Sequence, residues 1–418
     1  MPHATLAPGL HCRTLASQSQ RVQRRRVRMR VPIWLLSTFV LLLATFPSGV
    51  HAASDNPKLT PLVAEIIAPP HVIPGSDGRR HIVYELAVTN ITGGDVRFEK
   101  LKVVDADSGA PLAELGPDEL RTRVTPGASR GNENRELAAY QFAVIFLHVV
   151  LADGAAVPAR ITHEITAFFA VIGADMTVTI GEGAVVAKAP VALGPPLRGK
   201  GYVAADGCCD SIRHVRALLS LDGKFYLAQR FAIDWEQIDD NNTLVVGDLK
   251  VPANYHIYGK PILAVADGTV VGTRDDLQDQ VPGALPANLP IDEADGNFVV
   301  LDIGSGLFVN YAHMRPGSIK VKLGDKVQRG DQIGEVGNTG NSQAPHLHLH
   351  VMDSASPLAS DGLPYVFDSF TITAVGEATE DFDMAEATGS PMTLTPRVPP
   401  QKLEDVLPLD LSVVDWPQ

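Results

Sequence analysis

The chain of 418 residues is 45% hydrophobic, 6% aromatic and 20% charged, so it has enough apolar side chains to fill the cores of about two domains. A wholly disordered or fibrous protein is excluded. The 35 basic and 48 acidic residues give a net charge of −13, but residues 1–52 hold seven arginines and no acidic residue. The rest of the chain has 28 basic and 48 acidic residues, a net charge of −20, which argues against nucleic-acid binding.

Residues 1–52 have the order of a secretory signal peptide. Basic residues come first, an apolar run over 33–44 follows, and the small-residue site Val50-His51-Ala52 ends the segment. The apolar run is shorter than the roughly 20 residues of a spanning helix. We therefore expect cleavage, no stable membrane span afterwards, and a secreted, periplasmic or cell-envelope protein. Met29 also fits as the start of an ordinary signal peptide, which leaves open an upstream extension of the reading frame.

The segment 54–193 is expected to be a β-sandwich domain. Short runs such as 81–88 alternate apolar and polar residues, 142–147 is apolar throughout, and turn signals recur between such runs. This spacing predicts a sandwich of immunoglobulin-like size with a scaffold or binding role. The Pro/Gly-rich stretch 194–201 reads as a linker to a second domain.

The second domain is expected over 202–370 and is also predicted to be β-rich, which makes the fold class all-β. Residues 217–220 and 225–234 flank the turn 221–224 and predict a hairpin. The segment 275–295 contains three prolines and reads as a long loop that could border a cleft. Residues 371–418 form an acidic, Pro-containing tail in which the sequence indicates at most one strand, and it leaves open whether the tail is partly disordered or wraps back onto the first domain.

The mature chain keeps two adjacent cysteines, Cys208 and Cys209. Neighbouring side chains on a strand point to opposite faces, so the two do not readily share one metal. We interpret them as buried thiols or as a vicinal disulfide.

Three histidines alternate along the segment His346-Leu347-His348-Leu349-His350. On a strand these imidazoles would share one face, at a spacing of about 6 to 7 Å. Aligned imidazoles are costly to bury without partners, but they can bind a metal or act as acid and base.

Four motifs in order extend this signal. They are 261–270, the segment Tyr311-Ala312-His313, 324–334, and the Gly-rich turn 334–345 that leads into the histidine strand. With these motifs, residues 228–352 resemble the LytM/lysostaphin-type zinc metalloendopeptidases, which cut peptide bonds in bacterial cell-wall peptidoglycan. The resemblance implies a LytM/lysostaphin-like β domain that binds one Zn²⁺ and acts on stem or cross-bridge peptides.

The resemblance also implies roles for individual residues. It makes His348 and Asp234 zinc ligands, and His313 and His346 the catalytic imidazoles. The family takes its remaining ligand from the first position of a His-x-x-x-Asp segment, which here is Arg230-Phe231-Ala232-Ile233-Asp234. A guanidinium keeps its proton and offers no lone pair, so Arg230 cannot ligate zinc.

Two protein ligands fall short of the three that are usual in catalytic zinc sites, so another residue must supply the third. His350 is a candidate by its facing and His256 is a weaker one. We favour His214, provided that the predicted hairpin has an odd-length loop or a bulge. A two-residue turn would instead pair Arg230 with Val215 and put His214 on the wrong side.

The sequence thus predicts an exported zinc endopeptidase of the cell wall. The alternative is a catalytically degenerate relative that binds wall peptides or regulates another hydrolase, with Arg230 paired to Asp234 in place of the metal. A lipoyl- or biotinyl-like carrier domain is disfavoured, because Lys326 lies between Asp325 and Val327 and not in a carrier's setting.

Overall fold

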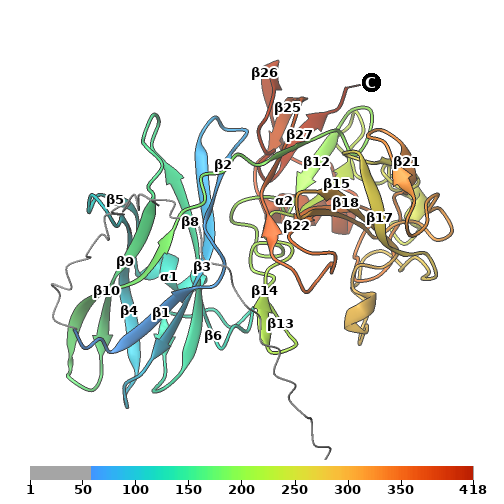
Figure 1. Ribbon diagram of the computed structural model, residues 1–418. Helices are drawn as coiled ribbons and strands as arrows, with labels where there is room; N and C mark the ends of the chain where they lie inside the picture. Colours follow the sequence, from blue (N-terminus) through green and yellow to red (C-terminus); the bar gives the residue numbers. More distant parts are fainter. Residues whose placement is uncertain (1–57, 418) are drawn as a thin grey trace, which may run out of the picture. The chain divides into compact units, whose positions relative to one another are not determined.

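The computed structural model describes residues 58–417 (Figure 1), so the expected signal peptide lies outside the described residues. The described chain is built almost entirely of β-strands, which confirms the all-β fold class. Two α-helices and two short 3₁₀ helices accompany the strands; these are α1 (Pro117–Arg123), α2 (Thr379–Thr388), η1 (Pro252–Asn254) and η2 (Ile291–Glu293). Within the described part of the chain, no helix is long and apolar enough to cross a membrane.

The N-terminal domain consists of two 5-stranded antiparallel sheets. The first sheet contains β1 (Leu62–Ile66), β2 (His71–Pro74), β3 (Arg80–Asn90), β6 (Val124–Pro126) and β8 (Phe142–Leu151). The second contains β4 (Val96–Asp105), β5 (Pro111–Leu115), β7 (Glu136–Leu137), β9 (Arg160–Phe169) and β10 (Ala174–Ala184). Apolar side chains from both sheets form one core. An immunoglobulin-like arrangement of the strands stays a prediction.

Strand β3 is buried on both faces. Its even-numbered positions, such as Tyr84 and Leu86, enter the core between the two sheets. Val83, on the opposite face, belongs to the core of the second domain. Because side chains alternate along a strand, Glu85 faces the second domain together with Val83.

The second domain is organised around an 11-stranded sheet. In spatial order its strands are β20 (Lys326–Val327), β17 (Gly268–Arg274), β18 (Phe298–Gly304), β19 (Leu307–Ala312), β22 (Leu347–Met352), β15 (Ile233–Gln237), β12 (Tyr202–Ala205), β27 (Ser412–Asp415), β25 (Phe370–Gly376) and β26 (Leu394–Leu403), with β23 (Gly362–Leu363) paired to β22. Three small sheets complete the domain; they pair β11 (Val191–Leu193) with β24 (Tyr365–Phe367), β13 (Leu219–Leu221) with β14 (Lys224–Tyr226), and β16 (Pro261–Leu263) with β21 (Gln332–Glu335).

The C-terminal segment is integrated into this sheet. Strand β27 lies between β12 and β25 (Figure 1) and pairs with both. Helix α2 packs Phe382 and Ala385 against a core that includes Val413 of β27. The sequence gave little sign of α2, because few of its residues are apolar and its N-cap, Ala378, makes no capping hydrogen bond.

The predicted hairpin forms at its tip only. Strands β13 and β14 pair Leu219 with Tyr226 around a two-residue turn at Asp222-Gly223. Pairing stops at Tyr226, and residues 227–232 form turns before β15 begins. The register of this hairpin therefore does not decide where His214 lies.

Candidate active site

Neighbouring strands of the large sheet bring Asp234 and His348 together. Asp234 of β15 is the direct cross-strand partner of His348 of β22. Ala312, at the end of β19, pairs with His348 from the other side, so His313 follows immediately beyond the strand. Directly opposed residues of an antiparallel pair share a face, which puts Asp234 and His348 on the same side of the sheet.

The Asp234 carboxylate is the centre of a histidine cluster. His348 donates its Nδ1–H to Asp234 Oδ1 over 2.8 Å. Nε2 of His346 lies 3.4 Å from the same oxygen, and Nε2 of His214 lies 3.2 Å from Oδ2. Burial alone would raise the pKa of Asp234, but the nearby positive charges of His214, His346 and His348 hold the pKa well below the ordinary value. Asp234 is therefore a carboxylate anion.

His214 is held with its Nε2 toward that anion. It lies in the turn segment between β12 and β13 and donates its Nδ1–H to the backbone carbonyl of Asp206 over 2.9 Å. A neutral imidazole with the proton on Nδ1 would present a lone pair to the carboxylate, so the arrangement calls for a cation at Nε2, either a proton or a metal. Burial lowers the pKa of His214, yet the charge of Asp234 outweighs it and raises the pKa to about 9.

His313 and His346 are anchored in the same manner. His313 donates its Nδ1–H to the carbonyl of Thr339 over 2.7 Å, and His346 donates its own to the carbonyl of Ala344 over 2.8 Å. Their ring centroids are 4.6 Å apart. Burial, and then the positive charges of His346 and His348, lower the pKa of His313 well below its ordinary value. His313 is therefore a neutral imidazole with Nε2 as a free acceptor.

The Gly-rich turn explains how Thr339 reaches His313. Gly340 has a φ of +78°, and a Cβ there would lie 2.3 Å from the backbone nitrogen of Gly296. Only glycine fits that conformation and that close approach. The turn thus brings the carbonyl of Thr339 against the His313 ring.

Arg230 does not pair with Asp234, contrary to the arrangement expected for a degenerate site. Its guanidinium forms a buried bidentate pair with Glu85 of β3, in which Nε donates to Oε1 over 2.8 Å and Nη2 donates to Oε2. Arg230 is 1% exposed and Glu85 is fully buried. The side chain that replaces a ligand histidine is thus turned toward the N-terminal domain, and its charge is balanced there.

The two other candidates for a third ligand lie differently. His350 is behind His348, with its Nδ1 2.8 Å from His348 Nε2, and does not contact Asp234. His256 lies opposite Asp239, with 3.9 Å between Nε2 and Oδ2. Of the three histidines, the structure places His214 beside Asp234.

The cluster opens into a cavity of about 270 Å³. Leu285 and Ala294 of the predicted cleft-bordering loop line it, as expected. Glu386 and Phe382 of α2 form another part of its wall, which the sequence did not indicate. Burial raises the pKa of Glu386 to about 7, although Arg213 opposes the shift. The C-terminal segment thus contributes directly to the site.

The donor atoms are suited to a zinc ion. One atom each from His214, Asp234 and His348 forms a set in which all lie within 4.8 Å of one another. Two imidazoles and one carboxylate are a usual protein ligand set for zinc with an open position. In addition, the Nε2 lone pair of His214 already faces the carboxylate, a contact that a cation resolves. The residues present therefore fit the metal.

Residues 254–360 match the model of Peptidase family M23. The chain contains a peptidase family M23 domain. This confirms the family predicted from the motifs. The matched segment includes His313, His346 and His348 of the M23 domain, whereas His214 and Asp234 precede it.

Two curated relatives share this region. The chain is 29% identical over 184 residues to the peptidoglycan DD-endopeptidase ShyA of Vibrio cholerae, a match covering 40% of this chain and 39% of the relative. It is 33% identical over 93 residues to an uncharacterized metalloprotease of Buchnera aphidicola, covering 22% of this chain and 20% of the relative. The chain thus spans less than half the length of either relative. Among solved structures, the catalytic domain of lysostaphin from Staphylococcus simulans is similar at 22% identity, with a TM-score of 0.21, over 39% of this chain and 88% of that domain.

Proposed function

We propose that this protein is an exported zinc metalloendopeptidase that hydrolyses peptide bonds of bacterial peptidoglycan. The observation that carries the proposal is the convergence of His214 Nε2, Asp234 Oδ and His348 Nδ1 on one point at the cavity. His214 would be the third ligand in place of the missing histidine at position 230. The M23 family match supports peptidase chemistry, and the printed name of the ShyA relative supports peptidoglycan as substrate.

A zinc ion held by His214, Asp234 and His348 supplies Lewis-acid polarisation of the scissile carbonyl and makes a water molecule more acidic. The remaining chemistry belongs to His313 and His346. Each has its Nδ1–H fixed by a backbone carbonyl, so its Nε2 is the atom available to the reaction. One can take a proton from the attacking water, and the other, once protonated, can donate a hydrogen bond to the developing oxyanion.

The export of the protein is part of the same proposal. A peptidoglycan substrate lies outside the cytoplasmic membrane, and the arginine-rich, apolar leader over residues 1–52 fits delivery there. The acidic body of the chain is consistent with a protein that acts on peptides and not on nucleic acid.

Digestion of purified peptidoglycan tests the proposal. The zinc-loaded protein should release peptide fragments with new amino and carboxyl ends, identified by mass spectrometry. His348→Ala should abolish release, and His256→Ala, which alters a histidine outside the cluster, should not. If His348→Ala digests peptidoglycan as well as the unaltered protein does, the enzyme proposal is wrong.

The degenerate alternative predicts a different result in the same assay. In that case the unaltered protein would bind peptidoglycan without releasing fragments. Arg230 was the reason for this alternative, but its charge is neutralised by Glu85 and leaves Asp234 free to ligate. The geometry therefore favours the enzyme.

A further inference from the structure

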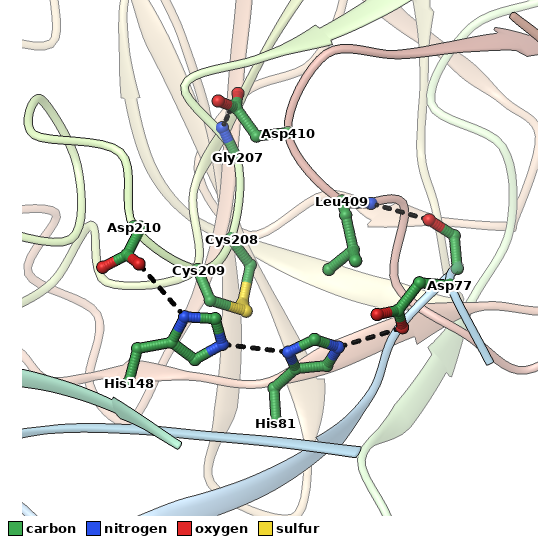
Figure 2. The surroundings of a disulfide bond; sticks show 10 residues. Asp77, His81, His148, Gly207, Cys208, Cys209, Asp210, Leu409 and Asp410 are labelled. Carbon is green, nitrogen blue, oxygen red and sulfur yellow. Dashed lines mark hydrogen bonds and ion pairs between the residues drawn. A yellow bond between two sulfur atoms is a disulfide. The ribbon is translucent and has the colours of Figure 1, made fainter. Parts of the chain in front are cut away.

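A second cluster of metal-ligating side chains lies where the N-terminal domain meets the loop after β12. His81 of β3 and His148 of β8 face each other, with 2.9 Å between His81 Nδ1 and His148 Nε2. Cys209 follows β12 and is joined to Cys208 by a disulfide. Figure 2 shows the two imidazoles in a row beside the disulfide. One donor atom each from His81, His148 and Cys209 lies within 4.8 Å of the others.

A carboxylate holds the outer nitrogen of each imidazole. His81 Nε2 lies 3.0 Å from Asp77 Oδ1, and His148 Nδ1 lies 3.2 Å from Asp210 Oδ2 (Figure 2). A carboxylate only accepts hydrogen bonds, so each outer nitrogen carries the proton. In neutral imidazoles the two inner nitrogens would then both be lone-pair acceptors, and they face each other. A cation between them, either a proton or a metal, removes this conflict.

The same pattern is typical of metal-binding histidines, whose second nitrogen usually donates to a carboxylate or a carbonyl. Two imidazole ligands at about 2.0–2.1 Å from a tetrahedral zinc are about 3.3 Å apart. The observed 2.9 Å therefore needs to open only slightly. What the cluster lacks in the oxidised chain is a third donor, because the Cys209 sulfur is bonded to Cys208.

We propose that reduction of the Cys208–Cys209 disulfide creates a second zinc site, formed by His81 Nδ1, His148 Nε2 and the Cys209 thiolate. A dithiol reductant supplies two electrons and two protons, breaks the sulfur–sulfur bond and becomes a disulfide itself. Zinc binding then displaces the proton of the Cys209 thiol, since the thiolate is the ligand. A borderline-soft divalent cation such as zinc suits this set of two nitrogens and one sulfur.

This site goes beyond the proposed function and shares no ligand with the peptidase cluster. It would join the two domains, since His81 and His148 come from the N-terminal domain and Cys209 from the second. The loop that carries Cys209 also carries Asp206, whose carbonyl accepts the hydrogen bond from His214. The reduced, metal-bound loop is thus adjacent to the candidate third ligand of the peptidase.

Cobalt binding by the full chain tests the proposal. Co²⁺ bound to a thiolate gives a charge-transfer band in the near ultraviolet, and a site of imidazole and carboxylate ligands does not. Metal-free protein reduced with a phosphine and kept without oxygen should bind one more equivalent of Co²⁺ than oxidised protein and should show this band. Cys208→Ser frees the Cys209 thiol without any reductant, and this variant should show the band directly.

The matched control is Cys209→Ser, which leaves the thiol of Cys208 and should lack both the band and the extra equivalent. His348→Ala should lose cobalt at the peptidase cluster and keep the band, so failure of the proposed function is distinguishable from failure of this site. The proposal is overturned if reduced protein and Cys208→Ser bind no additional cobalt, or if Cys209→Ser shows a band of the same strength.

Discussion

Arg230 and Glu85 form a buried ion pair that connects the catalytic segment to the N-terminal domain. The two residues are 145 positions apart in sequence, and both of their side chains are almost completely removed from solvent. The pair accounts for an arginine at the position where the family has a ligand histidine. It also frees Asp234 to interact with His214, His346 and His348.

Removal of Glu85 should destabilise the protein strongly. Glu85→Ala leaves the Arg230 guanidinium buried without a counter-charge, which costs about 3–5 kcal/mol. The matched control is Asp118→Ala, because Asp118 pairs with Arg121 at the surface, where the side chains are 94% and 61% exposed. The control should cost no more than about 1 kcal/mol. Urea unfolding measures both, and equal losses would contradict the structural role of the pair.

The C-terminal strand β27 should contribute to the stability of the whole domain. Val413 on this strand is 2% exposed, so Val413→Ala should lower the free energy of unfolding by about 2 kcal/mol through lost burial and a new cavity. Val398 of β26 is 88% exposed, and Val398→Ala should change it by less than about 0.5 kcal/mol. A similar result for both variants would mean that the tail is not integrated as described.

Stability should fall with rising pH because of Asp410. Burial raises the pKa of Asp410 to about 7, with the neighbouring charge of Asp206 adding to the shift. The folded state thus holds a proton that the unfolded chain releases near pH 4. This contribution is complete below about pH 4 and is lost as the pH rises through about 7.

Asp410→Asn removes the titration and keeps an oxygen to accept the Gly207 N–H, which Asp410 Oδ1 accepts over 3.0 Å. The stability of the unaltered protein relative to Asp410→Asn should fall by on the order of 2 kcal/mol between about pH 5 and about pH 8. Chemical denaturation at the two pH values measures it. A difference that is independent of pH would refute this assignment.

His350 should act as a positioning residue for His348. When His348 ligates through Nδ1, its Nε2–H is left to donate to His350 Nδ1, 2.8 Å away. Loss of such a partner typically lowers metal affinity about 10- to 100-fold. Zinc titration should show this loss for His350→Ala in a Cys209→Ser background, where the second cluster lacks its thiolate. His256→Ala should bind zinc unchanged, and an unchanged affinity in His350→Ala would exclude the role.

The sequence was informative wherever local spacing determines geometry. The alternation of His346 and His348 on a strand and the Tyr-x-His position of His313 follow from strand periodicity and motif order, and the structure brings all three histidines together. The all-β class follows in the same way from short alternating runs.

Relationships that depend on distant segments could not be read. His214 reaches Asp234 through an irregular loop held by the Asp206 carbonyl, whereas we had argued from the register of a hairpin that ends at Tyr226. The partner of Arg230 is on a strand of the other domain, so no local pattern pointed to Glu85. Helix α2 lacks a clear apolar stripe and is stabilised by packing against the β27 region.

The most direct test of the central claim is zinc titration of the metal-free Cys209→Ser protein with and without His214→Ala. We predict one tightly bound equivalent when His214 is present. Without His214 the affinity should fall more than about 100-fold, beyond the loss expected for a residue outside the ligand set. Equal zinc affinity in the two proteins would contradict the assignment of His214, Asp234 and His348 as the metal site.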